Sequence, residues 1–274
     1  MRKLVLFFLI VNVTIAGNAQ SNKTPVTGIL GAFRDEANYL LTQVQQKKEI
    51  VIQQVHFTEG ILSGRHVVIA QTGMGKVNAA MTATLMLEHF QPREIIFTGI
   101  AGALNPQLLP GDLVIGTRVT YHDYGIIDPD TMLHRPTHNP FTLKENPLYF
   151  TCDTQLVGYA RALSNTISLE KIHRNNTDQS PRIITGTIVT GDVFVSSETA
   201  ARNLQQQLQA DATEMEGAAV AQVCWQQQVP FIVIRSMSDN ANNHAHADVV
   251  AFYEVAAHNS ARFVMGILQM LAKK

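Results

Sequence analysis

The chain has 274 residues, with 21 Lys and Arg against 22 Asp and Glu, so its net charge is −1 when the histidines are neutral. A charge this close to zero gives no electrostatic basis for binding nucleic acid or an anionic membrane. The 46% of hydrophobic residues fits a globular protein with a sizeable core, in one or two domains. The two cysteines, Cys152 and Cys224, are too few for a disulfide scaffold and do not have the spacing of metal ligands. We therefore expect two buried thiols.

The N-terminus predicts an export signal over residues 1–19. Arg2 and Lys3 are basic, residues 4–16 form an apolar stretch too short to span a bilayer comfortably, and residues 17–19 are small enough for a signal peptidase. The alternative is a buried first strand, which leaves the order of these three features unexplained. We therefore expect residues 20–274 to form a single exported domain, periplasmic or secreted.

Apolar strand-like runs alternate with helical patterns along the rest of the chain. Strands are predicted at residues 26–30, 50–57, 66–71, 94–98, 113–121, 183–190 and 231–235. Helices are predicted at residues 35–46, 76–89, 147–169, 197–208, 216–227 and 249–272. The alternation predicts an α/β domain with a mostly parallel, mixed sheet. Residues 128–147 carry four prolines and are predicted to be a long loop with a functional or partner contact.

Glycines cluster where the predicted strands end. They are Gly28, Gly31, Gly73, Gly75, Gly99, Gly102 and Gly191. Ligands of open α/β sheets bind at the carboxyl ends of strands, and glycine allows a close approach of the backbone, so we expect a small-molecule site at this edge. Residues 71–77, Gln-Thr-Gly-Met-Gly-Lys-Val, lack the spacing of a phosphate loop, which argues against a nucleoside triphosphate.

Acidic residues recur at the ends of apolar runs. Glu214 and Glu216 flank Met215 where a strand turns into a helix, and Glu36 and Asp239 follow two other runs. Alone, the Glu214–Glu216 pair is typical of a helix N-terminus, whose dipole favours acids. Because a buried carboxylate is costly without a polar partner, the recurrence favours a site.

Several motifs occur in order along the chain. They are residues 31–36 (Gly-Ala-Phe-Arg-Asp-Glu), 98–104 (Thr-Gly-Ile-Ala-Gly-Ala-Leu), 110–114 (Pro-Gly-Asp-Leu-Val), 190–194 (Thr-Gly-Asp-Val-Phe), 214–216 (Glu-Met-Glu) and 234–239 (Ile-Arg-Ser-Met-Ser-Asp). Together they resemble the nucleoside phosphorylase superfamily, and within it the 5′-methylthioadenosine/S-adenosylhomocysteine nucleosidases. The resemblance spans residues 26–271. It implies a three-layer α/β/α sandwich and hydrolysis of the bond between adenine and a 5′-substituted ribose, with no cofactor and no metal.

The resemblance also implies roles for four residues. Asp239 matches the general acid at adenine N7, and Glu36 matches the base that activates water. Glu216 matches the residue that holds the ribose hydroxyls and stabilises positive charge on the sugar. Arg235 would orient acidic groups or the water. Without the motifs, Glu36 could be a solvated first-turn residue, Asp239 a helix N-cap and Arg235 a surface residue.

Further positions match the substrate pocket of the family. Phe194 resembles the aromatic residue that stacks on the purine, and Val195 would offer main-chain contacts to the adenine edge. Positions matching contacts to the rest of the nucleoside are Phe33, Met74, Gly102, Met215 and Val249. Apolar side chains suit a thioether at the 5′ position, although ordinary core packing competes with this interpretation.

Some residues depart from the family pattern. Ile100 stands where the family commonly has a serine that positions water or a ribose oxygen. Val249 stands where many members have phenylalanine, which would widen the 5′ pocket. Residues 242–248 include His244 and His246, and we interpret them as a solvated loop or substrate lid rather than a metal site.

Two rival functions stay open at this point. A phosphorylase on the same fold needs a cationic, hydroxyl-rich phosphate site. Residues 97–100 lack the arginine and serine of related phosphorylases, but Arg34 and Lys76 lie near the glycine loops. The second rival is an exported nucleoside-binding protein, which would not need Glu36. The resemblance further implies a homodimer in which a partner loop, residues 128–147, closes the 5′ pocket.

Overall fold

The computed structural model describes residues 25–32, 34–129, 131–174 and 177–273, without the side chains of residues 34–36 and 174. The predicted export signal lies outside these residues. The helices are α1 (Arg34–Gln43), α2 (Lys76–Phe90), α3 (Thr154–Ser164), α4 (Glu198–Leu208), α5 (Gly217–Gln226) and α6 (Ala245–Ala272). The strands are β1 (Thr27–Gly31), β2 (Gln45–Ile52), β3 (Val55–Leu62), β4 (Arg65–Gln71), β5 (Glu94–Ala103), β6 (Leu113–Tyr121), β7 (Gly125–Ile127), β8 (Met132–His134), β9 (Phe150–Thr151), β10 (Ile172–Arg174), β11 (Thr177–Gln179), β12 (Ile183–Thr190), β13 (Ala212–Glu214) and β14 (Phe231–Asp239).

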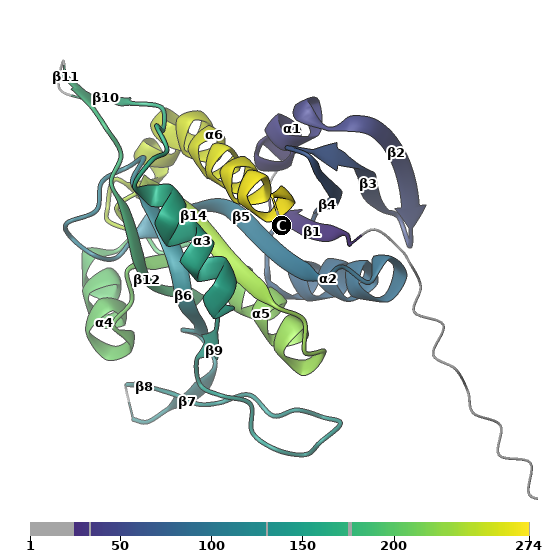
Figure 1. Ribbon diagram of the computed structural model, residues 1–274. Coiled ribbons are helices and arrows are strands. Elements are labelled where there is room, and N and C mark those ends of the chain that lie inside the picture. The colour runs from purple at the N-terminus through teal and green to yellow at the C-terminus, as the bar shows by residue number, and fades with distance from the viewer. Residues whose placement is uncertain (1–24, 33, 130, 175–176, 274) are drawn as a thin grey trace, which may run out of the picture.

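A mixed sheet with strand order β13-β12-β6-β14-β5-β1-β4-β3-β2 organises the molecule (Figure 1). β4, β1, β5 and β14 are parallel neighbours, as are β6, β12 and β13. β6 runs antiparallel to β14, and β2, β3 and β4 form an antiparallel meander. Because β13 also pairs with β5, the strands β5, β14, β6, β12 and β13 close into a ring. This closure brings the ends of β5, β12, β13 and β14 together.

Helices cover both faces of the sheet. α6 lies on one face with α1 and α3 packed against it, and α2 packs against α5 on the other (Figure 1). β5 shows the two sides: Thr98 contacts Ser260 of α6, with 2.6 Å between their hydroxyl oxygens, whereas Ile95 lies near Met86 of α2. Residues 95 and 98 of a strand point to opposite faces. The predicted α/β class, with three layers and a mixed sheet, is confirmed.

Most predicted elements are present, and the exceptions have local causes. The strand predicted at residues 50–57 is wrong because Gln53 and Gln54, at φ 48° and 66°, form a turn between β2 and β3. The helix predicted at residues 147–169 is shorter, since Asp153 caps α3 by accepting hydrogen bonds from two backbone N–H groups. The short strand β13 is absent from the prediction. Both β5 and β14 continue past their predicted ends, toward the carboxyl edge of the sheet.

The two cysteines are free and buried, as predicted. Burial raises the pKa of the Cys152 thiol to about 12, so the thiol is neutral at physiological pH. In the part of the chain that the structure describes, no helix combines the length and the apolar character needed to cross a membrane.

Candidate active site

The turn between β13 and α5 is fixed by a buried carboxylate, that of Glu214. Its oxygens accept hydrogen bonds from the N–H of Gly217 at 2.7 Å, the N–H of Glu216 at 3.1 Å and the hydroxyl of Thr190. The Arg235 guanidinium adds a fourth donor, with Nη2 2.7 Å from Oε2. Because two of these donors are backbone N–H groups of the turn itself, the Glu214 carboxylate holds the turn that carries Glu216.

Arg235 lies behind this turn on β14. Its side chain is 1% exposed, so the surface-residue alternative is wrong. Nη1 donates to the carbonyls of Phe97 and Ile234, and the guanidinium carbon lies 4.1 Å from the centre of the Phe97 ring. The predicted orienting role therefore has a specific acidic partner, which is Glu214.

Asp239 ends β14 with 1% of its surface exposed. Oδ1 accepts from the N–H of Ala241 at 2.7 Å, and Oδ2 accepts from the Ser238 hydroxyl at 2.8 Å. Burial raises the pKa of Asp239 above its usual value, although these two hydrogen bonds oppose the shift. A carboxyl of this kind can retain a proton for general-acid catalysis. The N-cap alternative is wrong, because α6 begins at Ala245 and its N-cap is His244.

Glu216 stands between β13 and α5 with 4% of its surface exposed. Its Oε1 accepts a hydrogen bond of 2.8 Å from the N–H of Gly75. Gly75 belongs to the loop between β4 and α2 and has a φ of 94°, a region that favours glycine. The glycine loop, residues 71–77, is thus joined to the carboxylate that the motifs assign to ribose binding.

A small cavity of about 30 Å³ lies at the ring-closing ends of the strands. Its lining residues are Gly102, Val193, Phe194, Val195, Thr213, Glu214, Met215 and Asp239. Five of the predicted site residues therefore meet here: Gly102, Phe194, Val195, Met215 and Asp239. A cavity of this size holds only about one or two water molecules. Phe194 is 44% exposed, and entry of a purine requires it or Met215 to move.

Gly102 of β5 lies close to Asp239. The two residues are paired in the register of β5 and β14. A Cβ at Gly102 would lie 2.9 Å from Asp239 Oδ1 and 3.2 Å from the Cβ of Ala241. A larger residue would therefore displace the carboxyl, which explains a glycine at this position.

The other predicted residues lie outside this cavity. Met74 is 56% exposed in the glycine loop, and Val249 and Ile100 are half-buried on α6 and β5. Phe33 lies outside the described residues. Glu36 lies on α1, but its side chain is likewise outside the part that the structure describes.

Residues 242–248 are not one loop, because α6 begins a turn earlier than predicted. The His246 ring on this first turn contacts the Phe194 ring, with 4.6 Å between centroids. Among the described residues, no three His, Cys, Asp or Glu side chains are placed to hold a metal ion. The sequence reasoning assigned no role to Ser238 or to this contact of His246. Ser238 could have been found from its place beside Asp239, whereas the ring contact has no sequence signal.

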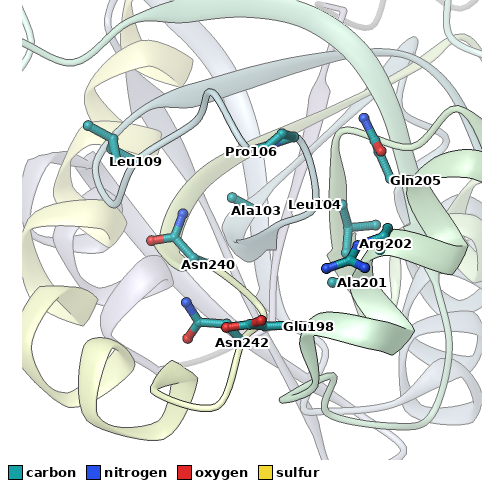
Figure 2. Close-up of a pocket in the computed structure, with 10 residues that line it drawn as sticks. All are labelled: Ala103, Leu104, Pro106, Leu109, Glu198, Ala201, Arg202, Gln205, Asn240 and Asn242. Carbon is teal, nitrogen blue, oxygen red and sulfur yellow. The ribbon is translucent and has the colours of Figure 1, made fainter.

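A larger cavity of about 420 Å³ lies next to the candidate site (Figure 2). Its lining residues are Ala103, Leu104, Pro106, Leu109, Glu198, Ala201, Arg202, Gln205, Asn240 and Asn242. Figure 2 shows Asn240 and Arg202 on opposite sides of it. Leu104 and Ala241 belong to an apolar cluster against which Val195 packs. None of the sequence-predicted site residues lines this larger cavity.

Comparisons with known proteins agree with the motifs. The family model described as "Phosphorylase superfamily" matches residues 26–269. A 5′-methylthioadenosine/S-adenosylhomocysteine nucleosidase of Mycobacterium bovis is 35% identical over 89% of this chain and 97% of its own length.

Two solved structures extend the comparison. The nucleosidase of the same name from Colwellia psychrerythraea, in complex with adenine, has a TM-score of 0.78 and 31% identity over 91% of this chain and 96% of its own. A futalosine hydrolase of Helicobacter pylori has a TM-score of 0.76 and 30% identity over 90% of this chain and 98% of its own. The resemblance predicted from the motifs is confirmed. The chain belongs to the phosphorylase superfamily and, within it, to the family of the 5′-methylthioadenosine/S-adenosylhomocysteine nucleosidases.

Proposed function

We propose that the protein hydrolyses the N-glycosidic bond of adenine nucleosides with a 5′-thio substituent, such as methylthioadenosine and S-adenosylhomocysteine, and releases adenine. The observation that carries this proposal is the buried Asp239 carboxyl, whose pKa is raised by burial and which lines one cavity with Phe194 and Gly102. The relatives of the same family are nucleosidases.

The reaction needs a proton at the purine and negative charge at the sugar. Asp239 protonates or hydrogen-bonds N7, so that adenine leaves as a neutral base when the bond from C1′ to N9 breaks. Glu216 holds the ribose hydroxyls and stabilises the positive charge that develops on the sugar. Glu36 takes a proton from the water that bonds to C1′; this role rests on its motif.

Hydrolysis is favoured over phosphorolysis by the pairing of two cations near the site. The Lys76 ammonium lies 2.6 Å from an Asp123 oxygen, and the Arg235 guanidinium pairs with Glu214. Phosphate is a dianion that binds through unsatisfied donors, so cations already neutralised by carboxylates are poor partners for it.

The decisive assay measures adenine release from methylthioadenosine, S-adenosylhomocysteine and adenosine, and hypoxanthine release from inosine, each with and without phosphate. Futalosine is a fifth substrate, because one structural neighbour is a futalosine hydrolase. We expect release without phosphate and a preference for the two thioethers. Strict phosphate dependence would establish a phosphorylase, and no turnover of any substrate would support a binding protein.

Two variants test the assigned chemistry. Asp239→Asn removes the acid while keeping the shape, and we expect turnover to fall by about 100-fold or more. Glu36→Gln should abolish turnover while sparing the affinity for methylthioadenosine. An unchanged rate in either variant removes that residue from the mechanism.

The protein is also proposed to be exported, where it would degrade extracellular adenine nucleosides and supply adenine for uptake. The order of charge, apolar run and small residues within residues 1–19 supports this. Cell fractionation with an antibody tests it, and protein found solely in the cytosol would contradict export.

A homodimer is the proposed assembly. An arm that contains β7, β8 and the loop after β8 projects from the body of the molecule (Figure 1). Its exposed apolar side chains are Tyr124, Ile126, Ile127, Leu133, Phe141 and Leu143. Such a surface is typical of a protein contact. Light scattering should give twice the monomer mass for the parent, and Phe141→Asp combined with Leu143→Asp should reduce it; a monomeric parent would refute the dimer.

A further inference from the structure

Lys76, in the glycine loop and at the start of α2, has no role in the proposed chemistry. Its Nζ lies 2.7 and 2.6 Å from the two carboxylate oxygens of Asp123, and 3.6 Å from Oδ2 of Asp192. The side chains of Lys76 and Asp123 are 23% and 24% exposed, so the pair is partly shielded from solvent. This lysine faces two acids from two other segments of the chain.

The same three residues are also joined by hydrogen bonds from backbone N–H groups to carboxylate side chains. Asp192 Oδ1 accepts a 2.8 Å hydrogen bond from the N–H of Lys76, and Asp123 Oδ2 accepts one of 2.8 Å from the N–H of Asp192. Lys76 begins α2, Asp123 follows β6 and Asp192 follows β12. The contacts therefore lock the glycine loop against the loop that follows β12.

His122 also contacts the loop that follows β12. A Cβ at Gly191 would lie 2.3 Å from Cε1 of the His122 ring, so glycine is what lets the loop rest on the ring. His122 is 7% exposed, and burial lowers its pKa, which keeps the ring neutral at pH 7. The start of the loop thus contacts both a neutral ring and Asp123.

Each locked loop carries one end of the proposed nucleoside site. On the ribose side, the N–H of Gly75 holds Glu216; on the purine side, Phe194 follows Asp192 by two residues. We propose that Lys76, Asp123 and Asp192 form an ionic clasp that fixes the spacing between these two loops, and that all three are positioning residues for the reaction. The inference rests on the proposed function, because it assumes that one nucleoside spans both loops.

Asp123 is the member of the clasp whose pKa the contacts shift. Burial pushes the pKa of Asp123 upward, but the hydrogen bonds from Lys76 and from the Asp192 N–H, together with the lysine charge, hold it below its usual value. Small displacements of reacting groups slow an enzyme greatly, so a fixed spacing between the loops matters more than the modest stability of a part-exposed ion pair.

Lys76→Met and Asp123→Asn break the clasp with little change in side-chain size, and Lys76→Arg keeps the charge. The matched control is Arg65→Met, which breaks a part-buried pair with Glu94 at 3.0 Å. Arg65 and Glu94 begin β4 and β5, at the opposite ends of these strands from the site. A purely structural role would make the control and the clasp variants behave alike.

We expect kcat/KM for methylthioadenosine to fall about tenfold or more in Lys76→Met and Asp123→Asn. Lys76→Arg should restore part of the loss, and Arg65→Met should retain the parent rate below its melting temperature. Inhibition by adenine, which occupies only the purine side, should change by less than about threefold, since it does not depend on the spacing. Clasp variants with the parent kcat/KM, or an adenine inhibition constant that rises as much as KM, would overturn the proposal.

Hydrogen exchange separates failure of the clasp from failure of the proposed function. If the parent cleaves no nucleoside, the proposed function is wrong, but the clasp still predicts faster exchange in residues 72–78 and 190–196 together in Lys76→Met. The control should leave both segments unchanged. Equal exchange in parent and Lys76→Met would overturn the clasp whatever the activity.

Discussion

Replacing Arg235 by methionine tests the buried ion pair beneath the site. The side chains of Arg235 and Glu214 are 1% and 3% exposed, so neither charged group can reach solvent when its partner is removed. Removing one partner of such a pair costs about 3–5 kcal/mol. Glu214 keeps the Thr190 hydroxyl and two backbone N–H donors, which places the expected loss near the lower end.

A loss of about 3 kcal/mol corresponds to a melting temperature lower by about 6–12 °C for a domain of this size. Thermal unfolding followed by circular dichroism measures it, in parallel with Glu214→Gln and the double variant. Because Glu214→Gln removes the orphaned charge, the double variant should be more stable than Arg235→Met alone. Additive effects of the two single changes, or a shift of less than about 2 °C in Arg235→Met, would refute the reasoning.

Three further changes test the site and its support. Ser238→Ala removes a donor to the Asp239 carboxylate, so the pKa of Asp239 should rise further and the basic limb of kcat/KM should move to higher pH; a limb that stays in place contradicts this. Gly102→Ala places a Cβ 2.9 Å from Asp239 Oδ1 and should slow turnover by about tenfold or more with the fold retained by circular dichroism; parent activity would show that the carboxyl can shift freely. Burial lowers the folded pKa of His122, so the unfolded chain binds the proton more tightly and stability falls as pH drops from about 6.5 through that lower pKa. His122→Gln should flatten the dependence of melting temperature on pH, and a dependence equal to that of the parent would count against a buried neutral ring.

Secondary structure was predicted correctly where the pattern of hydrophobic residues was not interrupted. The apolar run of residues 113–121 and the helical pattern of residues 76–89 predicted β6 and α2 almost to the residue. The pattern failed at Gln53 and Gln54, where a turn without Gly or Pro interrupts two strands that read as one. It also missed β13, since three residues show no period and are held by pairing with two distant strands.

The site was predictable to the extent that its residues lie in motifs at strand ends. The motifs predicted Asp239 and Glu216 as site residues, and the structure buries both side chains, at the end of β14 and just after β13. Register was not predictable: the approach of Gly102 to Asp239 depends on how β5 aligns with β14. The ion pair of Arg235 with Glu214 likewise depends on the ring closure, which no local pattern specifies.

The polar and the apolar side chains of the candidate site differ in how firmly they are held. Asp239 is anchored by a hydroxyl and a backbone N–H, and Glu216 by the N–H of Gly75, so both proposed catalytic carboxyl groups are held by the protein. Phe194 and Met74 are 44% and 56% exposed, so a larger part of each side chain faces solvent. Because the cavity that Phe194 lines is only about 30 Å³, a purine can enter it only if lining side chains move. In the proposed mechanism, the anchored polar groups act on the glycosidic bond, whereas the exposed apolar side chains contact the purine and the rest of the nucleoside.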